Sequence, residues 1–283
     1  MIKQYDSIAD LHADYIARKC RRKSFISINN SWYNNETPEQ TQRYTRSGDT
    51  SLVSKAEEIL ESLETNIETE RLQWERAPSG AYCVVPDVLA GLPTPMRRQA
   101  SYTDTKAPIN IFASTMSSAG VDSKTLAKRG TVILALVLAL MRTRPVRLWQ
   151  LTCTDGYADR SGETIITAQI NTAPLDLATA CYVLTSAGFA RDITYNLAEK
   201  LNDFSGGWPR AFNYRNPSAY YNSLIDRLVP PSEAKNTLII PGGQLGDRLL
   251  KEPLQWVQHY VDRFRKIQND EEAEFFTANV DID

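Results

Sequence analysis

Two apolar segments separated by a short turn-rich run constrain the fold of this chain more than any other feature. Val146–Cys153 and Thr164–Ile170 both have the composition of buried strands, and only residues Thr154–Gly162 separate them. Parallel neighbours need a crossover of about a dozen residues or more, whereas antiparallel neighbours can be joined by a hairpin. The sequence therefore predicts a hairpin, and with it a sheet that contains an antiparallel strand.

The segments before this hairpin predict a strand followed by a helix. The apolar side chains of Ile109–Phe112 predict a short buried strand, and we expect a helix from Ser123, a good N-cap, to the residue before Pro145. Residues Val132–Met141 are nearly all apolar, so this helix must pack deeply against a sheet. The order predicts an α/β domain with a Rossmann-like, mostly parallel sheet and one antiparallel edge strand.

After the hairpin, the pattern predicts further helices around one more strand. Pro174 fits the first turn of a helix, Gly188 fits its C-terminal stop, and another helix is expected through Leu201. Thr237–Ile240 predicts a buried strand and Pro253–Ile267 the last helix. The chain contains no Gly-x-Gly-x-x-Gly or Gly-x-x-x-x-Gly-Lys run that would argue for a nucleotide.

The remaining parts divide the chain into three regions. We expect a helical N-terminal region with an extended connector over 1–106, the α/β domain over 107–268 and an acidic tail over 269–283. One N-terminal helix is expected from Ser7 to Lys19 and a longer one from Ser51 to Trp74. Prolines and glycines between Ala77 and Lys106 indicate a connector that wraps over the core.

Composition excludes several classes of protein. A chain of 283 residues with 42% hydrophobic and 23% charged residues is typical of a globular protein. A net charge of −2 gives no overall attraction for nucleic acid, so such binding must come from a local patch. The run Val132–Met141 is well short of the roughly 20 residues that a membrane span needs. The four cysteines form no Cys-x-x-Cys pair, which disfavours zinc and favours free thiols in a reducing cytoplasm.

Several strings in the chain resemble a known family. The apolar helix is flanked by Arg129-Gly130 and by Arg142–Leu148, and Ala173–Ala178 follows the hairpin. With Val85-Pro86 and Gly91–Met96, these strings resemble a family of bacteriophage proteins of unknown function that has a von Willebrand factor A-like core. The resemblance implies a fold and a location in the cytoplasm of an infected bacterium, and it implies no mechanism.

The resemblance also implies a place for a metal ion. In von Willebrand A domains the first strand ends in Asp-x-Ser-x-Ser, whose oxygens hold Mg²⁺. The same frame reads Ala113-x-Thr115-x-Ser117 in this chain, so the only charged group of the motif is missing. Thr115 and Ser117 remain candidate ligands, with Asp155 or Asp176 as the carboxylate that would replace the aspartate. We favour the alternative, a tight loop of small residues without a cofactor.

The sequence predicts no catalytic constellation. His12 and His259 are the only histidines and are expected at the surface, in the first and the last helix. The carboxylate pairs Glu57-Glu58 and Glu271-Glu272 indicate a solvated helix face and a solvated tail. We therefore expect the protein not to be an enzyme.

A segment rich in aromatic residues is the first candidate for binding. Residues Ser205–Tyr221 interleave rings with arginines between glycines and prolines, and single-strand binding surfaces stack bases on rings while arginines meet phosphates. The candidate nucleic-acid-binding residues are Trp208, Arg210, Phe212, Tyr214 and Arg215, with the basic run Arg21, Arg22 and Lys23. The alternatives are aromatic rings that fix a loop to the core or bind a protein, and a basic run that ends an exposed helix.

The acidic tail is the second candidate. Its composition resembles the tails of single-strand DNA-binding proteins, and Phe275 and Phe276 are the candidate partner-binding residues; the alternative is a solvated tail. The leading interpretation is a non-enzymatic phage adaptor that binds single-stranded DNA and recruits a replication or transcription partner, such as a phage polymerase. The other interpretation is a von Willebrand A-type protein-interaction module, metal-assisted and partnered with an ATPase.

Overall fold

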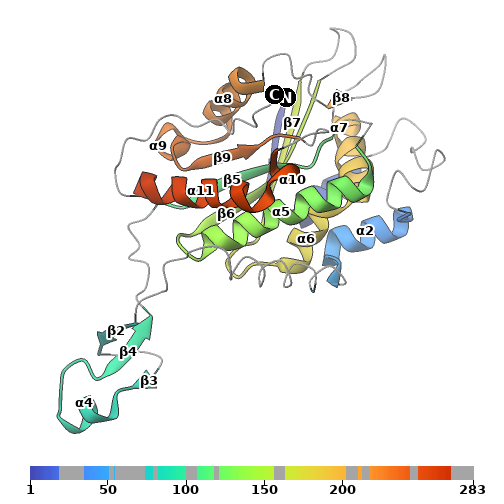
Figure 1. Ribbon diagram of the computed structural model, residues 1–283. Coiled ribbons are helices and arrows are strands. Elements are labelled where there is room, and N and C mark those ends of the chain that lie inside the picture. Colours follow the sequence, from blue (N-terminus) through green and yellow to red (C-terminus); the bar gives the residue numbers. More distant parts are fainter. Residues whose placement is uncertain are drawn as a thin grey trace.

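A mixed β-sheet with the strand order β1-β7-β6-β5-β9 lies at the centre of the computed structural model (Figure 1). The structure describes residues 1–18, 35–50, 54, 74–78, 82–99, 107–117, 121–155, 163–201, 210–211, 217–242 and 248–268. The strands are β1 (Ile2–Tyr5), β5 (Ile109–Ser114), β6 (Val146–Asp155), β7 (Thr164–Ile170) and β9 (Thr237–Ile240), and β8 (Arg210–Ala211) pairs with the end of β6. The predicted α/β class is confirmed.

The pairing of the strands confirms the hairpin and corrects the position of its second strand. β5 pairs in parallel with β6 and with β9, and β7 runs antiparallel to β6, as the short link between them predicts. However, β7 does not lie at the edge of the sheet, because β1 pairs with it in parallel and Ile2 lies opposite Ile165. The expected antiparallel edge strand is therefore an inner strand, and the edge position belongs to β1.

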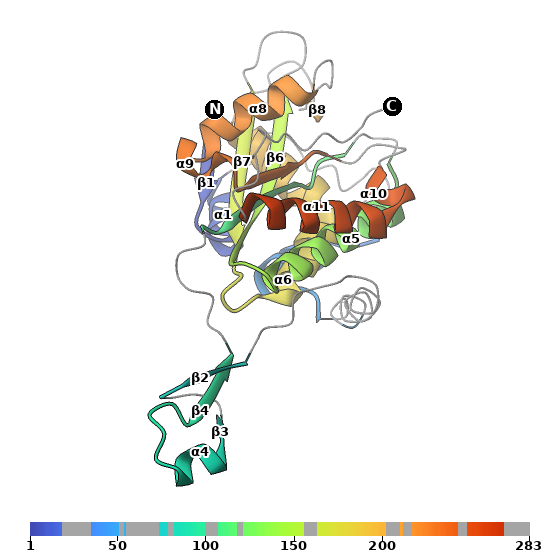
Figure 2. The same ribbon diagram turned by 60° about the vertical axis from the view of Figure 1, so that its left-hand side comes forward.

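Helices cover both faces of the main sheet (Figures 1 and 2). The larger hydrophobic core lies on the face covered by α5 and its neighbours, and the smaller core lies on the face covered by α8 and α9. The first group is α1 (Ile8–Ala17), α2 (Pro38–Ser47), α5 (Ser123–Met141), α6 (Leu177–Thr185), α7 (Tyr195–Leu201), α10 (Arg248–Lys251) and α11 (Pro253–Gln268). The second group is α8 (Pro217–Leu228) and α9 (Pro231–Ala234).

The apolar helix α5 is buried between the sheet and other helices, as expected. Its N-cap is Asp122, one residue before the predicted Ser123, and the Asp122 side chain accepts a hydrogen bond from the Thr125 amide at 2.6 Å. Most of Val132–Leu140 is buried, because α6 and α11 pack on the sides of the helix that the sheet leaves open. Even so, no helix among the described residues is both long enough and apolar enough to cross a membrane.

The N-terminal residues belong to the α/β domain, which changes the domain boundary expected at residue 107. The predicted cap Ser7 is confirmed, since its hydroxyl accepts from the Asp10 amide at 3.0 Å. Ile8, Leu11 and Tyr15 of α1 are buried in the larger core, and Tyr44 of α2 packs against it. The longer helix expected over 51–74 and the tail from residue 269 lie almost entirely outside the described residues.

The segment after the hairpin also differs in detail from the prediction. Pro174 follows a cis peptide bond and precedes α6, whose N-cap is Asp176. Gly188 has helical dihedral angles (φ −62°, ψ −50°) and leads directly into a π-helix, η4 (Phe189–Thr194), so it does not end a helix. The chain from α6 to α7 is therefore almost continuously helical.

The region expected to be a connector contains a small unit of its own. Its antiparallel sheet has the order β2-β4-β3, with β2 (Trp74–Ala77), β3 (Tyr82–Cys83) and β4 (Met96–Gln99). A five-residue helix, α4 (Val85–Leu89), lies between β3 and β4. Both views show this small unit apart from the main sheet (Figures 1 and 2). The prediction of a connector that wraps over the core was therefore wrong.

Candidate functional site

The carboxyl edge of the main sheet brings together the described parts of two candidate segments, the residues after β5 and the short strand β8. β5, β6 and β9 are parallel, so all three end at this edge. The chain leaves β5 toward β6 on one side, and β9 pairs with β5 on the other side, so the strand order reverses between β5 and β9. In open α/β sheets this reversal at the carboxyl ends is where ligands bind.

The backbone of the aromatic segment reaches the same edge. β8 pairs antiparallel with the end of β6, and Arg210 lies opposite Asp155. Of the candidate nucleic-acid-binding residues, Arg210 is the one whose backbone the structure describes. Trp208, Phe212, Tyr214 and Arg215 lie outside the described residues, as do Arg21, Arg22, Lys23, Phe275 and Phe276. Tyr220, at the end of this segment, packs against the smaller core, which favours the structural interpretation for that ring.

Thr115 and Ser117 lie at the expected place, after β5, but both are buried. Their exposed fractions are 6% and 8%, and the Gln150 amide donates to the Thr115 hydroxyl at 3.3 Å and to Thr152. The Gln150 carbonyl oxygen has no hydrogen-bond partner among the described residues, although the side chain is fully buried. These contacts make a small, neutral polar cluster under the edge.

A buried arginine spans the ends of β5 and β9. The guanidinium of Arg129, a side chain that is 4% exposed, donates to the Ser114 carbonyl at 2.9 Å and to the Pro241 carbonyl. The positive charge of Arg129 therefore lies between β5 and β9, where the strand order reverses, beside the residues Ala113-x-Thr115-x-Ser117 at which a metal ion would bind. Because like charges repel, this arrangement disfavours a divalent cation there.

Asp176 does not lie near Thr115 and Ser117. It follows β7, which runs opposite to β5, and the neighbouring Thr172 hydroxyl donates to the Val146 carbonyl at the start of β6. The Asp176 carboxylate caps α6 and accepts from the Thr179 amide at 3.0 Å. The prediction that Asp176 is a ligand of this metal site was therefore wrong. Asp155 ends β6 at the correct edge, but the described part of the chain contains no group of three or more metal-binding side chains.

The sequence analysis missed a partly buried carboxylate, Glu36, that lies between α2, α6 and the start of η4. Glu36 accepts hydrogen bonds from Tyr182 at 2.8 Å, Ser186 at 2.9 Å and Thr41 at 3.2 Å. Burial raises the pKa of Glu36 above its ordinary value, and these hydrogen bonds oppose the increase. A Cβ atom at Gly188 would overlap the Glu36 carboxylate, so the glycine lets this carboxylate lie close to the start of η4. Glu36 thus joins the start of α2 to α6.

Two more titratable groups lie in this region. Burial raises the pKa of Asp192, in η4, to about 6, although the Asn196 amide donates to its carboxylate at 2.6 Å. His12 is 6% exposed, and its Nε2 has no hydrogen-bond partner among the residues described, so the expectation of a surface histidine was wrong. Burial, Arg46 and Lys200 all lower the pKa of His12. His259 is exposed, as expected.

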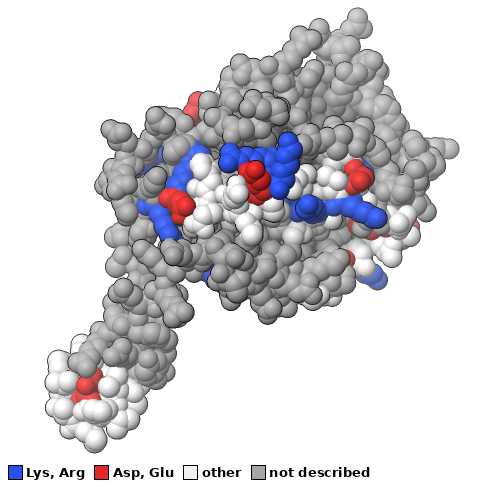
Figure 3. Space-filling view, viewed as in Figure 1, with Lys and Arg blue, Asp and Glu red and all other residues white. Residues whose placement is uncertain are grey.

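The face covered by α5, α10 and α11 offers no uniform basic patch in its described part. Blue and red side chains alternate across it (Figure 3). Arg248 and Glu252 form an ion pair at 3.6 Å, and Arg265 and Asp262 form one at 3.9 Å. Mixed charges of this kind do not attract a polyanion.

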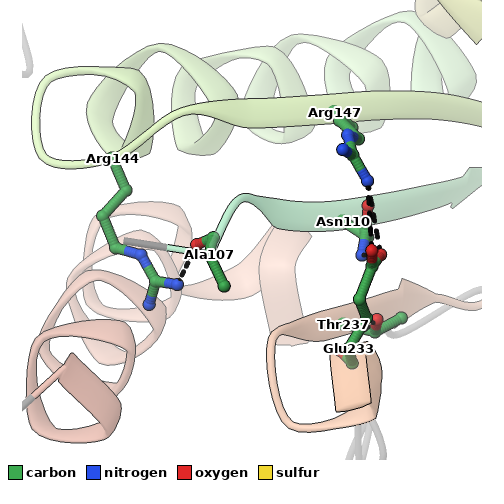
Figure 4. Close-up of polar contacts among 6 residues, drawn as sticks. All are labelled: Ala107, Asn110, Arg144, Arg147, Glu233 and Thr237. Carbon is green, nitrogen blue, oxygen red and sulfur yellow. Dashed lines mark hydrogen bonds and ion pairs between the residues drawn. The ribbon is translucent and has the colours of Figure 1, made fainter. Parts of the chain in front are cut away.

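The amino edge of the main sheet is a structural anchor. Glu233, in α9, accepts from Asn110 at 2.8 Å and pairs with Arg147 at 3.3 Å (Figure 4). Arg144 donates to Asn236 at 2.8 Å and to the Ala107 carbonyl, and burial lowers its pKa. These polar groups join α9 and the end of α5 to the start of β5, so their contacts are used within the fold.

Comparison with known proteins places the chain in one family. No curated protein and no solved structure matches it. A family model described as a domain of unknown function, DUF7192, matches residues 1–268. The match covers the N-terminal strand, the small unit and the main sheet together, which agrees with a domain that begins at β1. The chain therefore belongs to the DUF7192 family.

Proposed function

We propose that this chain is a non-enzymatic phage adaptor that binds single-stranded DNA at the carboxyl edge of its main sheet. In this proposal it recruits a replication or transcription partner, such as a phage polymerase, in the cytoplasm of an infected bacterium. The observation that carries the proposal is the pairing of Arg210 with Asp155, which supports a position for the aromatic segment at the ligand-binding edge.

The chemistry of the aromatic segment fits a flexible polyanion. Bases stack on aromatic rings with little regard to sequence, and arginines neutralise phosphates. With a net charge of −2, the molecule as a whole does not attract DNA, so binding depends on such a local surface. The described side chains of α10 and α11 have mixed charges and offer no basic patch of their own (Figure 3). Phe275 and Phe276 remain the proposed contacts for the protein partner.

A von Willebrand A-type interaction module is the second candidate. The succession of strand, helix, antiparallel hairpin and helix, followed by a strand on the other side of β5, favours it. Thr115 and Ser117 occupy the frame of the metal motif, and Asp155 is the remaining carboxylate at that edge. In this version a divalent ion assists docking of a protein partner such as an ATPase.

Binding to a fluorescent oligothymidylate, measured by anisotropy across a salt series with and without EDTA, separates the two candidates. We expect salt-sensitive binding that EDTA does not change. Trp208→Ala should weaken it about tenfold, since stacking contributes about 1–3 kcal/mol per base. Arg215→Ala should weaken it and reduce the salt slope by about one.

Lys235→Ala provides the matched control, because Lys235 is an exposed cation at the amino edge, between α9 and β9. Its substitution should leave the affinity unchanged. Absence of binding at low salt would refute the DNA-binding proposal. A Mg²⁺-dependent gain in thermal stability that EDTA reverses would favour the interaction module instead.

A further inference from the structure

The strand register of the small sheet divides its charged residues between two faces. In antiparallel strands, residues directly opposite each other lie on the same face, as do residues two apart along one strand. Arg76 in β2 lies opposite Arg97 in β4, which in turn lies opposite Tyr82 in β3. The next pair on the same face is Trp74 and Gln99. We call the face with these five residues the arginine face.

The second face of the small sheet has a different charge pattern. Glu75 lies opposite Arg98, and opposite charges in such a pair stabilise a sheet. Met96 lies between Ala77 and Cys83 on this face. Glu75 is the one carboxylate that β2, β3 and β4 contain, so the strand positions of the arginine face have two cations and no anion.

The opposed positions of Arg76 and Arg97 are unfavourable in an isolated sheet. Like charges directly opposite each other destabilise antiparallel strands. A bound polyanion reverses the sign of this contribution, because guanidinium groups donate charge-assisted hydrogen bonds to phosphate or carboxylate oxygens. The charge pattern of the arginine face is therefore complementary to a partner with closely spaced negative groups.

The aromatic residues of the arginine face distinguish among such partners. Trp74 and Tyr82 share this face with the two arginines. Surfaces that bind single-stranded nucleic acid combine cations, which neutralise phosphates, with rings, on which unpaired bases stack. An acidic peptide would use the cations and not the rings. The combination therefore favours single-stranded nucleic acid.

We propose that the arginine face of the small unit is a second binding surface for single-stranded nucleic acid. Arg76 and Arg97 neutralise phosphates, and Trp74 and Tyr82 stack on bases. The small unit lies apart from the main sheet (Figures 1 and 2), so this surface does not depend on the binding proposed for the carboxyl edge. A strand long enough to reach both surfaces binds more tightly than it would to either alone, since the second contact is intramolecular.

Anisotropy of a fluorescent oligothymidylate tests this surface on the full chain, in a background with Trp208→Ala and Arg215→Ala that removes proposed contacts of the carboxyl edge. Binding should remain in this background. Each phosphate contact contributes about 0.7 to the dependence of log affinity on log salt, so Arg97→Ala should reduce that slope by about 0.7. Extrapolated from about 1 M salt, this change makes binding about eightfold weaker at about 50 mM salt. Arg76→Ala should have the same effect.

Arg98→Ala is the matched control, because it removes the same charge from the adjacent position of β4 but lies on the second face. It should leave the affinity and the slope unchanged, and circular dichroism verifies that each variant is folded. Loss of all binding in the background variant would overturn this proposal, whereas residual binding that requires Arg97 supports it even if the carboxyl edge binds nothing. Equal weakening by Arg97→Ala and Arg98→Ala would also overturn it, because net charge alone would then explain the binding.

A competing polyanion tests the class of partner. Unlabelled oligothymidylate should displace the probe at least about tenfold more effectively than polyglutamate of equal charge, because polyglutamate has no bases to stack. Trp74→Ala should remove most of this preference. Polyglutamate that competes as well as oligothymidylate would identify an acidic protein as the partner and overturn the assignment to nucleic acid.

Discussion

At the residue scale, a buried arginine places a positive charge at the carboxyl edge of the main sheet. Arg129 lies on α5, yet its guanidinium bonds to carbonyl groups at the ends of β5 and β9. A metal-binding version of this edge would need a carboxylate in the position of Ala113. The chain has instead an alanine in the strand and a buried cation beside it, so this frame lacks the negative charge that attracts a divalent ion.

Asp192 provides a stability prediction at the same scale. Its folded-state pKa is raised from 3.8 to about 6, so ionising it costs more in the folded than in the unfolded chain. Its contribution to the free energy of unfolding therefore falls as the pH rises from about 4 to about 6. Asp192→Asn should remove that decrease and raise the free energy of unfolding at pH 8 by about 3 kcal/mol, since one pKa unit corresponds to about 1.4 kcal/mol.

Urea unfolding of wild type and variant between pH 4 and pH 8 measures this difference. Asp226→Asn is the control, because Asp226 is exposed in α8. The free energy of unfolding of this variant should change with pH in the same way as that of the wild type. A variant at Asp192 that is less stable than the wild type at pH 8 would show that the carboxylate makes a favourable contact there.

At the element scale, the crossing of α5 and α6 depends on a glycine. A Cβ atom at Gly130 would overlap the backbone carbonyl of Leu184, so the helices approach closely enough for backbone contact. The neighbouring residues Arg129 and Gly130 thus have different roles at the start of the apolar half of α5. Arg129 bonds to the end of β5, and Gly130 leaves room for the backbone of α6.

Gly130→Ala should therefore destabilise the protein, although alanine favours an isolated helix over glycine by about 1 kcal/mol. Overpacking of a buried contact costs about 1–3 kcal/mol, so we expect a net loss of about 2 kcal/mol in the free energy of unfolding. Urea titration measures it. Lys128→Ala, at an exposed position of the same helix, should change stability little. An increase in stability for Gly130→Ala would contradict the close crossing.

At the scale of the whole molecule, the chain consists of a core domain and a small unit inserted between α2 and β5. The views show β2, β3, β4 and α4 apart from the main sheet (Figures 1 and 2). The family match nevertheless spans both parts.

Replacing residues 74–99 with a flexible linker should leave the main domain stable, because the large core draws on other elements. We expect a change in the free energy of unfolding of the main domain within about 0.5 kcal/mol, as for changes away from a core. Replacing α2, whose Thr41 and Thr45 are buried, is the contrasting variant and should destabilise the domain. Unfolding followed by tryptophan fluorescence distinguishes the two outcomes. Loss of the main domain on removal of 74–99 would show that the parts depend on each other.

Features that depend on neighbours along the chain were predictable from the sequence alone. The short link predicted the antiparallel pairing of β6 and β7, and Ser7 predicted the start of α1. Thr237–Ile240 predicted β9. Hairpin length, capping and hydrophobic runs involve residues close in the sequence, so their physical cause can be recognised without the fold.

The contacts between segments that are distant in the sequence could not be predicted in this way. The pairing of Ile2 with Ile165 makes the residues before the first helix an outer strand, although no strand was expected in the N-terminal region. Asp176 and Thr115 each follow a strand. Because β7 runs opposite to β5, the two residues lie at opposite ends of the strands. The burial of His12 likewise depends on packing between helices far apart in sequence. Burial and long-range pairing depend on the whole arrangement of the chain, and no local pattern carries that information.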